Sequence, residues 1–252
     1  MKGGERRPSR RRPGRSERGV RGGRLHGPPA LKLIQRDIRA LRLPGFAGAP
    51  VHGPPVPSRI YLLGQAPGPH EARIGRPFAW TAGKTLFGWF ARALGASEEE
   101  VRARVYMAAV VRAFPGKTTS GGDRVPSRQE ILASRGFIER EMAVLRPRLV
   151  IPVGKLAIGQ VLCGEGGAPP LAEVVGRSFR VRYHGVATDV VCLPHPSGAS
   201  TWTKTEPGRS LTERALALLA RHPEIRRAFP RARGHQRRAA SALWRMARMA
   251  AP

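Results

Sequence analysis

The feature that most restricts the fold of this chain is an alternation of short apolar runs with longer helical patterns in its middle part. Each run is rich in β-branched and aliphatic residues and ends in glycine, proline or a small polar residue, as strands buried on both faces do. The runs cover residues 59–63, 105–111, 149–153 and 190–193, and the helical patterns cover residues 84–94, 128–145, 155–162 and 211–220. This order predicts an α/β fold of three layers, α/β/α, with a central, mostly parallel four-stranded sheet. Residues 177–183 are a candidate for an additional strand.

Both ends of the chain are strongly basic. Residues 1–24 contain ten basic and two acidic side chains with almost nothing apolar, so we expect residues 1–27 to form a disordered arm. From Arg226 onward there are eight arginines and no acid, and we expect residues 223–252 to be a basic tail with a short helix. The globular domain would then span residues 28–222. The net charge of +28 favours a polyanionic partner, most commonly nucleic acid, although arginine-rich ends also aid solubility or reflect genome composition.

Other classes of protein fit this composition poorly. No run of about 18 apolar residues is present, and the basic N-terminus lacks the apolar stretch of a secretory signal. Only Cys163 and Cys192 are present, which is too few for a disulfide framework. We therefore expect a cytoplasmic, nucleoid-associated protein with no membrane partner.

Three loops follow the carboxyl ends of predicted strands, where ligands bind in sheets of this kind. The first strand leads into residues 64–68 (Gly-Gln-Ala-Pro-Gly) and then 75–78 (Gly-Arg-Pro-Phe). The second leads toward residues 122–127, and the last into residues 194–200, in which His195 stands between two prolines. Glycines let the backbone approach a ligand, and prolines hold the histidine in a rigid loop. Taken singly, each of these features has a structural interpretation as well as a functional one.

Together and in this order, the motifs resemble those of the uracil-DNA glycosylase superfamily, most closely its bacterial iron–sulfur branch. That branch has Gly-Glu-Ala-Pro-Gly, Gly-Arg-Pro-Phe and a final His-Pro-Ser loop, matched here by residues 64–68, 75–78 and 195–197. Residues 145–157 also resemble its third strand and the helix that follows. The resemblance covers roughly residues 30–220 and leaves both basic ends unexplained. It implies the α/β/α fold and the removal of a damaged base from DNA.

The chain departs from that branch at the positions of its cofactor. The branch holds a four-iron cluster with four cysteines, and matching the motifs places Ala40, Leu43, Ala113 and Ser134 at those positions. Two cysteines elsewhere in the chain cannot replace four thiolate ligands. We therefore expect no iron–sulfur cluster, no other cofactor and no metal, with apolar packing in the place of the cluster.

Two further departures concern the chemistry. Relatives carry an acid near the start of the first motif, where this chain has Gln65 and Ala66. A glutamine can orient a water molecule, but it cannot stabilise a sugar cation by charge. Glu71 and Asp123 are the nearest acids in the motifs, and we favour Glu71 because it lies between the two glycine motifs. Relatives also read the base edge with an asparagine that Ala109 replaces, which puts a strict preference for uracil in question.

The resemblance assigns roles to the remaining motif residues. His195 would donate a hydrogen bond to a base carbonyl as that carbonyl becomes anionic, while Gln65 and Glu71 would hold the attacking water. Phe78 would stack on the extruded base, unless it only packs in the core. The predicted base pocket consists of Gly64, Gln65, Ala66, Phe78 and Ala109.

The remaining candidates are expected to contact DNA outside the base pocket. The loop Pro196, Ser197, Gly198 and Ala199 would enter the space that the base vacates. Lys84, Arg124 and Ser127 are candidates for phosphate contacts, with a solvated surface as the plain alternative.

These expectations combine into a monomeric DNA glycosylase, most directly for uracil, that acts on single- and double-stranded DNA and leaves an abasic site. One alternative is a glycosylase for hypoxanthine or xanthine, which Ala109 keeps open. Another is a nucleic-acid-binding relative without catalysis, favoured by the missing acid and opposed by His195 and Phe78. A metal-dependent phosphate-ester hydrolase lacks support, since no carboxylate cluster with metal-ligand spacing occurs in the sequence.

Overall fold

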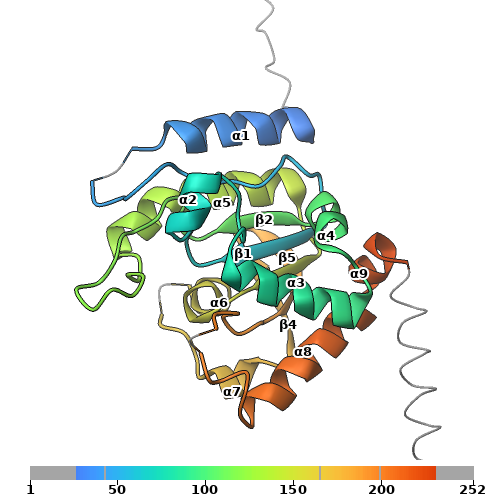
Figure 1. Ribbon diagram of the computed structural model, residues 1–252. Coiled ribbons are helices and arrows are strands. Elements are labelled where there is room, and N and C mark those ends of the chain that lie inside the picture. Colours follow the sequence, from blue (N-terminus) through green and yellow to red (C-terminus); the bar gives the residue numbers. More distant parts are fainter. Residues whose placement is uncertain (1–26, 43, 165, 199, 231–252) are drawn as a thin grey trace, which may run out of the picture.

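The computed structural model describes residues 27–42, 44–164, 166–198 and 200–230, and in them a five-stranded sheet lies between helices (Figure 1). The strands are β1 Ile60–Gly64, β2 Tyr106–Ala109, β3 Leu149–Pro152, β4 Ser178–Tyr183 and β5 Val186–Val191. Their order in the sheet is β2-β1-β3-β5-β4. β1, β2, β3 and β5 run parallel to their neighbours in this series, which confirms the predicted mostly parallel α/β sheet, and β4 pairs with β5 in the antiparallel sense.

The sheet has one strand more than the four predicted, and the candidate segment 177–183 forms it. β4 and β5 make a hairpin whose two turn residues, His184 and Gly185, have φ angles of 43° and 77°. Two consecutive positive φ angles give a turn whose twist matches that of the flanking strands. Most side chains of the edge strand β4 are exposed or half-buried, whereas β1 is buried along its full length. A partly exposed strand lacks a continuous apolar run, so its signal in the sequence is weaker.

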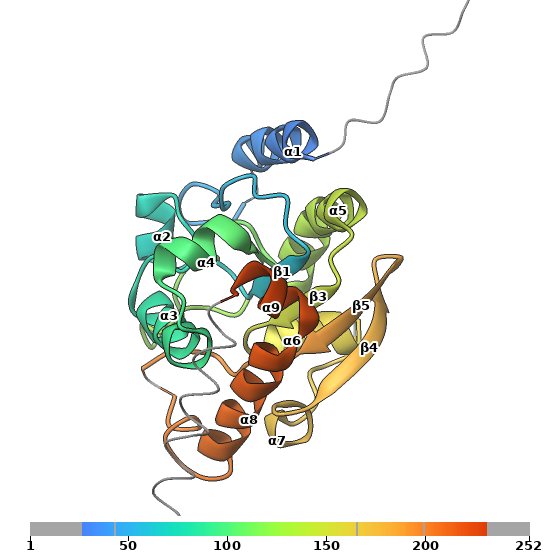
Figure 2. The same ribbon diagram turned by 90° about the vertical axis from the view of Figure 1, so that its right-hand side faces the viewer.

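Helices cover both faces of the sheet. They are α1 Pro28–Ala40, α2 Pro69–Ile74, α3 Thr81–Leu94, α4 Glu98–Arg104, α5 Arg128–Leu145, α6 Lys155–Leu162, α7 Leu171–Val174, α8 Gly208–Arg221 and α9 Pro223–Ala228. α1 packs against α5 on one side of the sheet, and α3 packs against α8 on the other (Figure 2). This is the predicted three-layer arrangement. Among the described residues, no helix is long and apolar enough to cross a bilayer.

A buried polar cluster joins α5 to the first two strands. The Glu141 carboxylate accepts hydrogen bonds from the hydroxyls of Tyr61 (2.5 Å) and Tyr106 (2.8 Å) and from the Arg112 guanidinium (2.7 Å). All four side chains are buried. Burial, reinforced by the negative charge of Glu141, raises the pKa of both tyrosines well above its usual value, so both remain hydrogen-bond donors. The cluster fixes α5 against β1 and β2, whose carboxyl ends form part of the site described below.

The folded part extends past the domain boundary predicted at residue 222. α9 follows α8 and packs against it, and Ile225 and Phe229 are buried in the hydrophobic core. Residues 223–229 therefore belong with the globular domain rather than with a tail. Of the basic arm predicted over residues 1–27 and the tail predicted over residues 223–252, residues 1–26 and 231–252 lie outside the described residues.

Candidate active site

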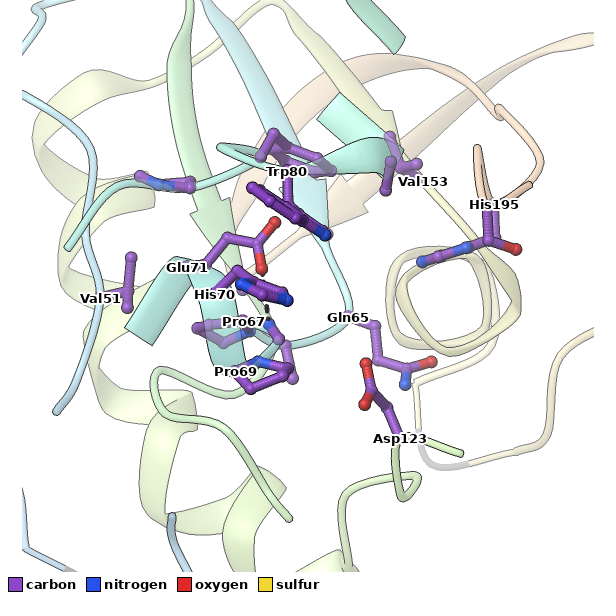
Figure 3. A pocket seen from close by; sticks show the side chains of 18 of the residues that line it. Val51, Gln65, Pro67, Pro69, His70, Glu71, Trp80, Asp123, Val153 and His195 are labelled. Carbon is purple, nitrogen blue, oxygen red and sulfur yellow. Dashed lines mark hydrogen bonds between the residues drawn. The ribbon is translucent and has the colours of Figure 1, made fainter. Parts of the chain in front are cut away.

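A cavity of about 290 Å³ opens at the carboxyl ends of the parallel strands (Figure 3). Its walls come from the loop after β1, from α2, from the segment leading into α3, from the ends of β2 and β3, and from the loops around Asp123 and His195. The predicted catalytic and base-binding residues all line it, namely Gly64, Gln65, Ala66, Glu71, Phe78, Ala109 and His195. Parallel strands place their following loops at one edge of the sheet, which is why motifs far apart in the sequence meet here.

The aromatic ring of Phe78 lies over the end of β1. A Cβ atom added to Gly64 would stand only 2.9 Å from Cζ of Phe78, so the absence of a side chain at Gly64 makes room for the ring. Phe78 is half-buried, packs against the hydrophobic core and borders the cavity. It therefore offers the cavity an apolar ring surface of the kind on which a planar base stacks.

The backbone of Phe78 is held in an unusual conformation by two other residues. Its φ angle is +51°, in the left-handed region that non-glycine residues seldom adopt. The buried Arg102 guanidinium donates to the carbonyl oxygens of Pro77 and Phe78, both at 2.9 Å. A Cβ atom at Gly83 would lie 1.8 Å from the Phe78 carbonyl oxygen, so only glycine fits there. The position of the Phe78 ring is thus set by contacts from α3 and α4.

His195 enters the cavity from the loop that follows β5. The prolines on either side of it are buried, which anchors the loop. The chain before it continues the sheet, because the Leu193 N–H donates to the Pro152 carbonyl at 2.9 Å and the Gly154 N–H donates to the Leu193 carbonyl at 2.9 Å. The imidazole lies against Gly154, where a Cβ atom would stand 3.2 Å from Cδ2 of the ring.

The His195 ring is accessible to solvent inside this concave site, yet the surrounding protein displaces much of its hydration. Reduced hydration of the charged form lowers the pKa of His195 below its usual value, while the negative charges of Asp123 and Glu71 act in the opposite direction. The ring is therefore neutral at pH 7 and carries one N–H donor. None of the residues that the structure describes forms a hydrogen bond with it, so this donor is available to a molecule in the cavity.

Two carboxylates come close to the glycine that ends the first motif. A Cβ atom at Gly68 would lie 2.9 Å from Oε2 of Glu71 and 3.5 Å from Oδ2 of Asp123. Glu71 is buried and accepts a hydrogen bond from the Gly68 N–H at 3.2 Å, so it caps the start of α2. Asp123 is half exposed and pairs with Lys117 at 3.3 Å. Negative charge thus reaches the cavity from two acids, although positions 65 and 66 carry none.

Two of the three predicted phosphate contacts have partners within the chain. Arg124 donates to both carboxylate oxygens of Glu130, at 3.0 and 2.6 Å, and to the Pro115 carbonyl. The Ser127 hydroxyl caps α5 by accepting the Glu130 N–H at 3.3 Å. These two side chains fix the loop between β2 and α5. Lys84 is exposed on α3, and it does not line the cavity.

The loop predicted to enter the vacated space lies at the cavity only in part. Ser197 lines the cavity, Pro196 is buried, and Gly198 is exposed. The Gly198 carbonyl accepts a hydrogen bond from Lys204 at 3.1 Å. Ala199 lies outside the described residues.

The residues present do not fit an iron–sulfur cluster. Cys192 is buried in the core, where loss of hydration raises the pKa of its thiol to about 12, and Cys163 lies on the surface after α6. Of the four matched positions, Ala40 is exposed at the end of α1 and Ala113 and Ser134 are buried, while Leu43 lies outside the described residues. The buried Ser134 hydroxyl has no hydrogen-bond partner among the described residues. With two cysteines in the whole sequence, four thiolate ligands cannot be assembled.

Four residues of functional interest were not found from the sequence. His70, Trp80 and Lys117 line the cavity, and Arg102 positions Phe78 from outside it. Trp80 follows the Gly-Arg-Pro-Phe motif by two residues, so proximity to the motif was a usable signal. Arg102 has only its spacing of four from Glu98, with which it pairs at 2.7 Å, and that spacing reads as an ordinary surface pair.

Comparison with known proteins agrees with this geometry. The family model described as the uracil DNA glycosylase superfamily matches residues 50–219. The Type-4 uracil-DNA glycosylase of Pyrobaculum aerophilum is 29% identical over 139 residues, which cover 55% of this chain and 66% of the relative. The Type-4 uracil-DNA glycosylase of Saccharolobus solfataricus is 32% identical over 143 residues, or 56% of this chain and 62% of the relative.

A third relative, the Type-4 uracil-DNA glycosylase of Sulfurisphaera tokodaii, is 26% identical over 143 residues, covering 56% of this chain and 61% of the relative. The chain thus spans slightly less than two thirds of the length of these relatives. The family match takes in all the strands and every residue that lines the cavity. The chain belongs to the uracil DNA glycosylase superfamily.

Proposed function

We propose that this protein is a DNA glycosylase that hydrolyses the N-glycosidic bond of a flipped, deaminated base, uracil first of all, and leaves an abasic site. Family membership and relatives named Type-4 uracil-DNA glycosylase support the reaction class. The observation that carries the proposal is the meeting of Phe78, Gln65 and His195 in one cavity at the carboxyl ends of the strands. An aromatic surface, a side-chain amide and a neutral imidazole are the groups that such a reaction needs.

The base is the first part of the substrate to be accommodated. A base inside a duplex is out of reach, so the nucleotide must rotate out of the helix at a cost of a few kcal/mol. Once extruded, the base stacks on Phe78, whose ring is fixed over Gly64. The rigid backbone at Phe78 keeps this surface in place before the substrate arrives, which limits the entropy lost on binding.

His195 acts on the departing base. As the glycosidic bond breaks, negative charge develops on a base carbonyl oxygen, and the neutral imidazole donates a hydrogen bond to it. The lowered pKa of His195 keeps the ring neutral at pH 7, so it stabilises the anion without transferring a proton. A preorganised donor of this kind is worth about 10²–10³ in rate.

Gln65 and the two acids near Gly68 act on the sugar and the attacking water. Gln65 holds the attacking water through its amide group, and the Glu71 carboxylate supplies the negative charge that favours the developing sugar cation. Asp123, whose carboxylate also lies near Gly68, adds to that charge. This arrangement replaces an acid at positions 65 or 66 with two acids from neighbouring segments.

DNA is the proposed partner, bound by a monomer without an iron–sulfur cluster, as single or double strands, in the cytoplasm beside the nucleoid. The support is the net charge of +28, of which more than half comes from the two ends of the sequence. Binding that releases counterions from DNA weakens steeply between about 50 and 200 mM salt. An affinity that barely changes over this range would contradict the role given to the basic ends.

A second candidate function is excision of hypoxanthine or xanthine. The observation that favours it is the wall formed by Ala108 and Ala109, which line the cavity without a side-chain polar group to read the base edge. An apolar wall discriminates weakly between bases that differ in their polar edges.

A cleavage assay tests the proposal. Labelled oligonucleotides with one uracil, hypoxanthine or xanthine, in single- and double-stranded form, are incubated with the wild-type protein and then treated with alkali to reveal abasic sites. His195→Ala and Phe78→Ala are tested in parallel. Cleavage at one lesion, strongly reduced in both variants, is the expected result and identifies the base. Tight, salt-sensitive DNA binding without cleavage of any lesion would instead identify a binding protein.

A further inference from the structure

The mouth of the cavity carries a stacked pair of aromatic side chains. The rings of His70 and Trp80 have centroids 4.0 Å apart and planes only 17° from parallel. Both side chains line the cavity, His70 from the first turn of α2 and Trp80 from the residue before α3 (Figure 3). They lie on the wall across the cavity from the His195 loop (Figure 3).

Trp80 is unusually exposed for its type. Its relative exposure is 42%, and it is the only aromatic residue among the large exposed apolar side chains of the described part of the chain. Tryptophan buries the most apolar area of any side chain and is enriched where a partner binds. An exposed indole at the edge of a ligand cavity therefore indicates a surface that a planar apolar group covers.

Contacts within the chain also fix the orientation of the Trp80 indole. Trp80 lies two residues after Phe78, whose backbone is fixed by Arg102 and Gly83. The Trp80 carbonyl accepts the N–H of Lys84 at 3.0 Å, which makes it the first acceptor of α3. His70 supports the indole from one side by stacking. The orientation of Trp80 is thus set before any ligand binds.

We propose that Trp80, supported by His70, is the stacking surface for the nucleobase adjacent to the one that is excised. This inference rests on the proposed function, because it places a DNA strand across the cavity. With the target base on Phe78, the neighbouring base of a single strand has a free face and can lie on the indole. In a duplex that neighbour remains stacked within the helix. Trp80 therefore favours single-stranded or locally opened DNA.

The chemistry of stacking determines what the site recognises. Every nucleobase has a flat π surface, so stacking on an aromatic residue tolerates any sequence. Trp80 should accordingly bind either a purine or a pyrimidine neighbour, but not a nucleotide that lacks a base. Replacing the aromatic residue by alanine usually weakens binding about 5- to 150-fold per stacked base.

The test removes the two partners separately and together. The substrates are single-stranded oligonucleotides with one deoxyuridine whose 5′ or 3′ neighbour is either a normal nucleotide or a tetrahydrofuran abasic analogue. Wild type and Trp80→Ala are compared by KM and kcat, and by Kd on 2′-fluoro-deoxyuridine versions, which resist hydrolysis. For one of the two neighbours, each single change should raise KM and Kd about 5- to 150-fold. Both changes together should have no larger effect than one.

Two variants separate stacking from a structural role. Trp80→Phe keeps an aromatic face and should recover most of the affinity, whereas a purely structural defect would depend on indole size. Ile74→Ala is the matched control, because Ile74 is similarly exposed at 46%, lies on the neighbouring helix and does not line the cavity. It should leave KM unchanged for every substrate. On duplex substrates, Trp80→Ala should change KM by less than on single strands.

The outcomes are distinguishable. If the wild type cleaves uracil but loss of either neighbouring base leaves KM and Kd unchanged, the stacking surface is wrong and the proposed function stands. The stacking surface would also be wrong if the effects of Trp80→Ala and of the missing neighbouring base multiplied, because the two changes would then act independently. If the wild type does not cleave the deoxyuridine substrates, uracil is not the base that it excises. The same comparison of Kd then decides whether Trp80 binds a base.

Discussion

Two groups of polar side chains in this molecule contrast sharply: the buried cluster around Glu141 and the groups around the cavity. In the cluster, one carboxylate receives hydrogen bonds from Tyr61, Tyr106 and Arg112, and all four side chains are buried. In the cavity, His195 has no hydrogen-bond partner among the described residues and reaches solvent. The first group uses up its bonding capacity to hold helix and sheet together. In the second group, Glu71 and Asp123 each have a partner within the chain, whereas His195 keeps its hydrogen-bonding capacity for a ligand.

The contrast teaches that residue type alone does not separate stability from function. Both groups contain at least one carboxylate and a basic side chain. What differs is how many partners each group finds in the folded chain. A fully paired buried group stabilises one arrangement of the fold. An unpaired donor beside a cavity can still form a hydrogen bond with a ligand.

The largest effect is expected from breaking the paired cluster. Glu141→Gln leaves the buried Arg112 without a counter-charge, which should lower the free energy of unfolding by about 3–5 kcal/mol. Urea denaturation of wild type and variant measures this. Glu139→Gln is the matched control on the same helix, because Glu139 pairs with Arg135 on the surface, where loss of a pair costs about 0–1 kcal/mol. An equal decrease in the free energy of unfolding of the two variants would contradict the larger contribution assigned to the buried cluster.

Removing the unpaired His195 side chain should lower activity rather than stability. His195→Ala should lower kcat on the preferred lesion about 10²–10³-fold, since one donor to the departing base is lost. The urea midpoint should shift little, because His195 makes no hydrogen bond to the described residues. Single-turnover cleavage and urea denaturation of the same preparation test both parts. A loss of activity that followed a loss of stability would place His195 with the structural group.

The shape of the cavity should depend on the close contact between Gly83 and the Phe78 backbone. Gly83→Ala puts a methyl group where the Phe78 carbonyl oxygen lies, so Phe78 must move. A displacement of about 1 Å can cost about 10²-fold in rate, and we expect kcat/KM to fall by that order. Gly88→Ala on the same helix is the control, because a Cβ atom there meets nothing within 4 Å. Its kcat/KM should stay at the wild-type value, and its unfolding free energy should rise by about 0.5–1 kcal/mol.

The smallest effect concerns pH. Because the pKa of His195 is lowered, kcat/KM should rise as pH increases through a value below that of a free histidine and then level off once the ring is neutral. Asp123→Asn removes a negative charge that raises this pKa, so the rising limb should move to lower pH. The pH dependence of kcat/KM for both proteins gives the answer. A rising limb that moved to higher pH would show that Asp123 does not act on His195 by charge.

Much of the fold could be predicted because its signals are local. A strand buried on both faces requires a continuous apolar run, so four such runs between helical patterns are enough to predict a parallel sheet. The edge strand β4 was less certain, because its partly exposed side chains dilute the pattern. The hairpin turn at His184 and Gly185 depends on backbone conformations that the residue types only permit.

The sequence by itself determined which loops would surround the site, since motifs that follow parallel strands must meet at one edge of the sheet. Only the tertiary structure decided what the side chains do there. It placed Arg102 on the Phe78 carbonyl, stacked His70 on Trp80, and bound Arg124 to Glu130 within the chain. The burial pattern of a helix or strand can be predicted from the apolar residues within that segment. Contacts between segments depend on the distances and orientations that packing alone sets.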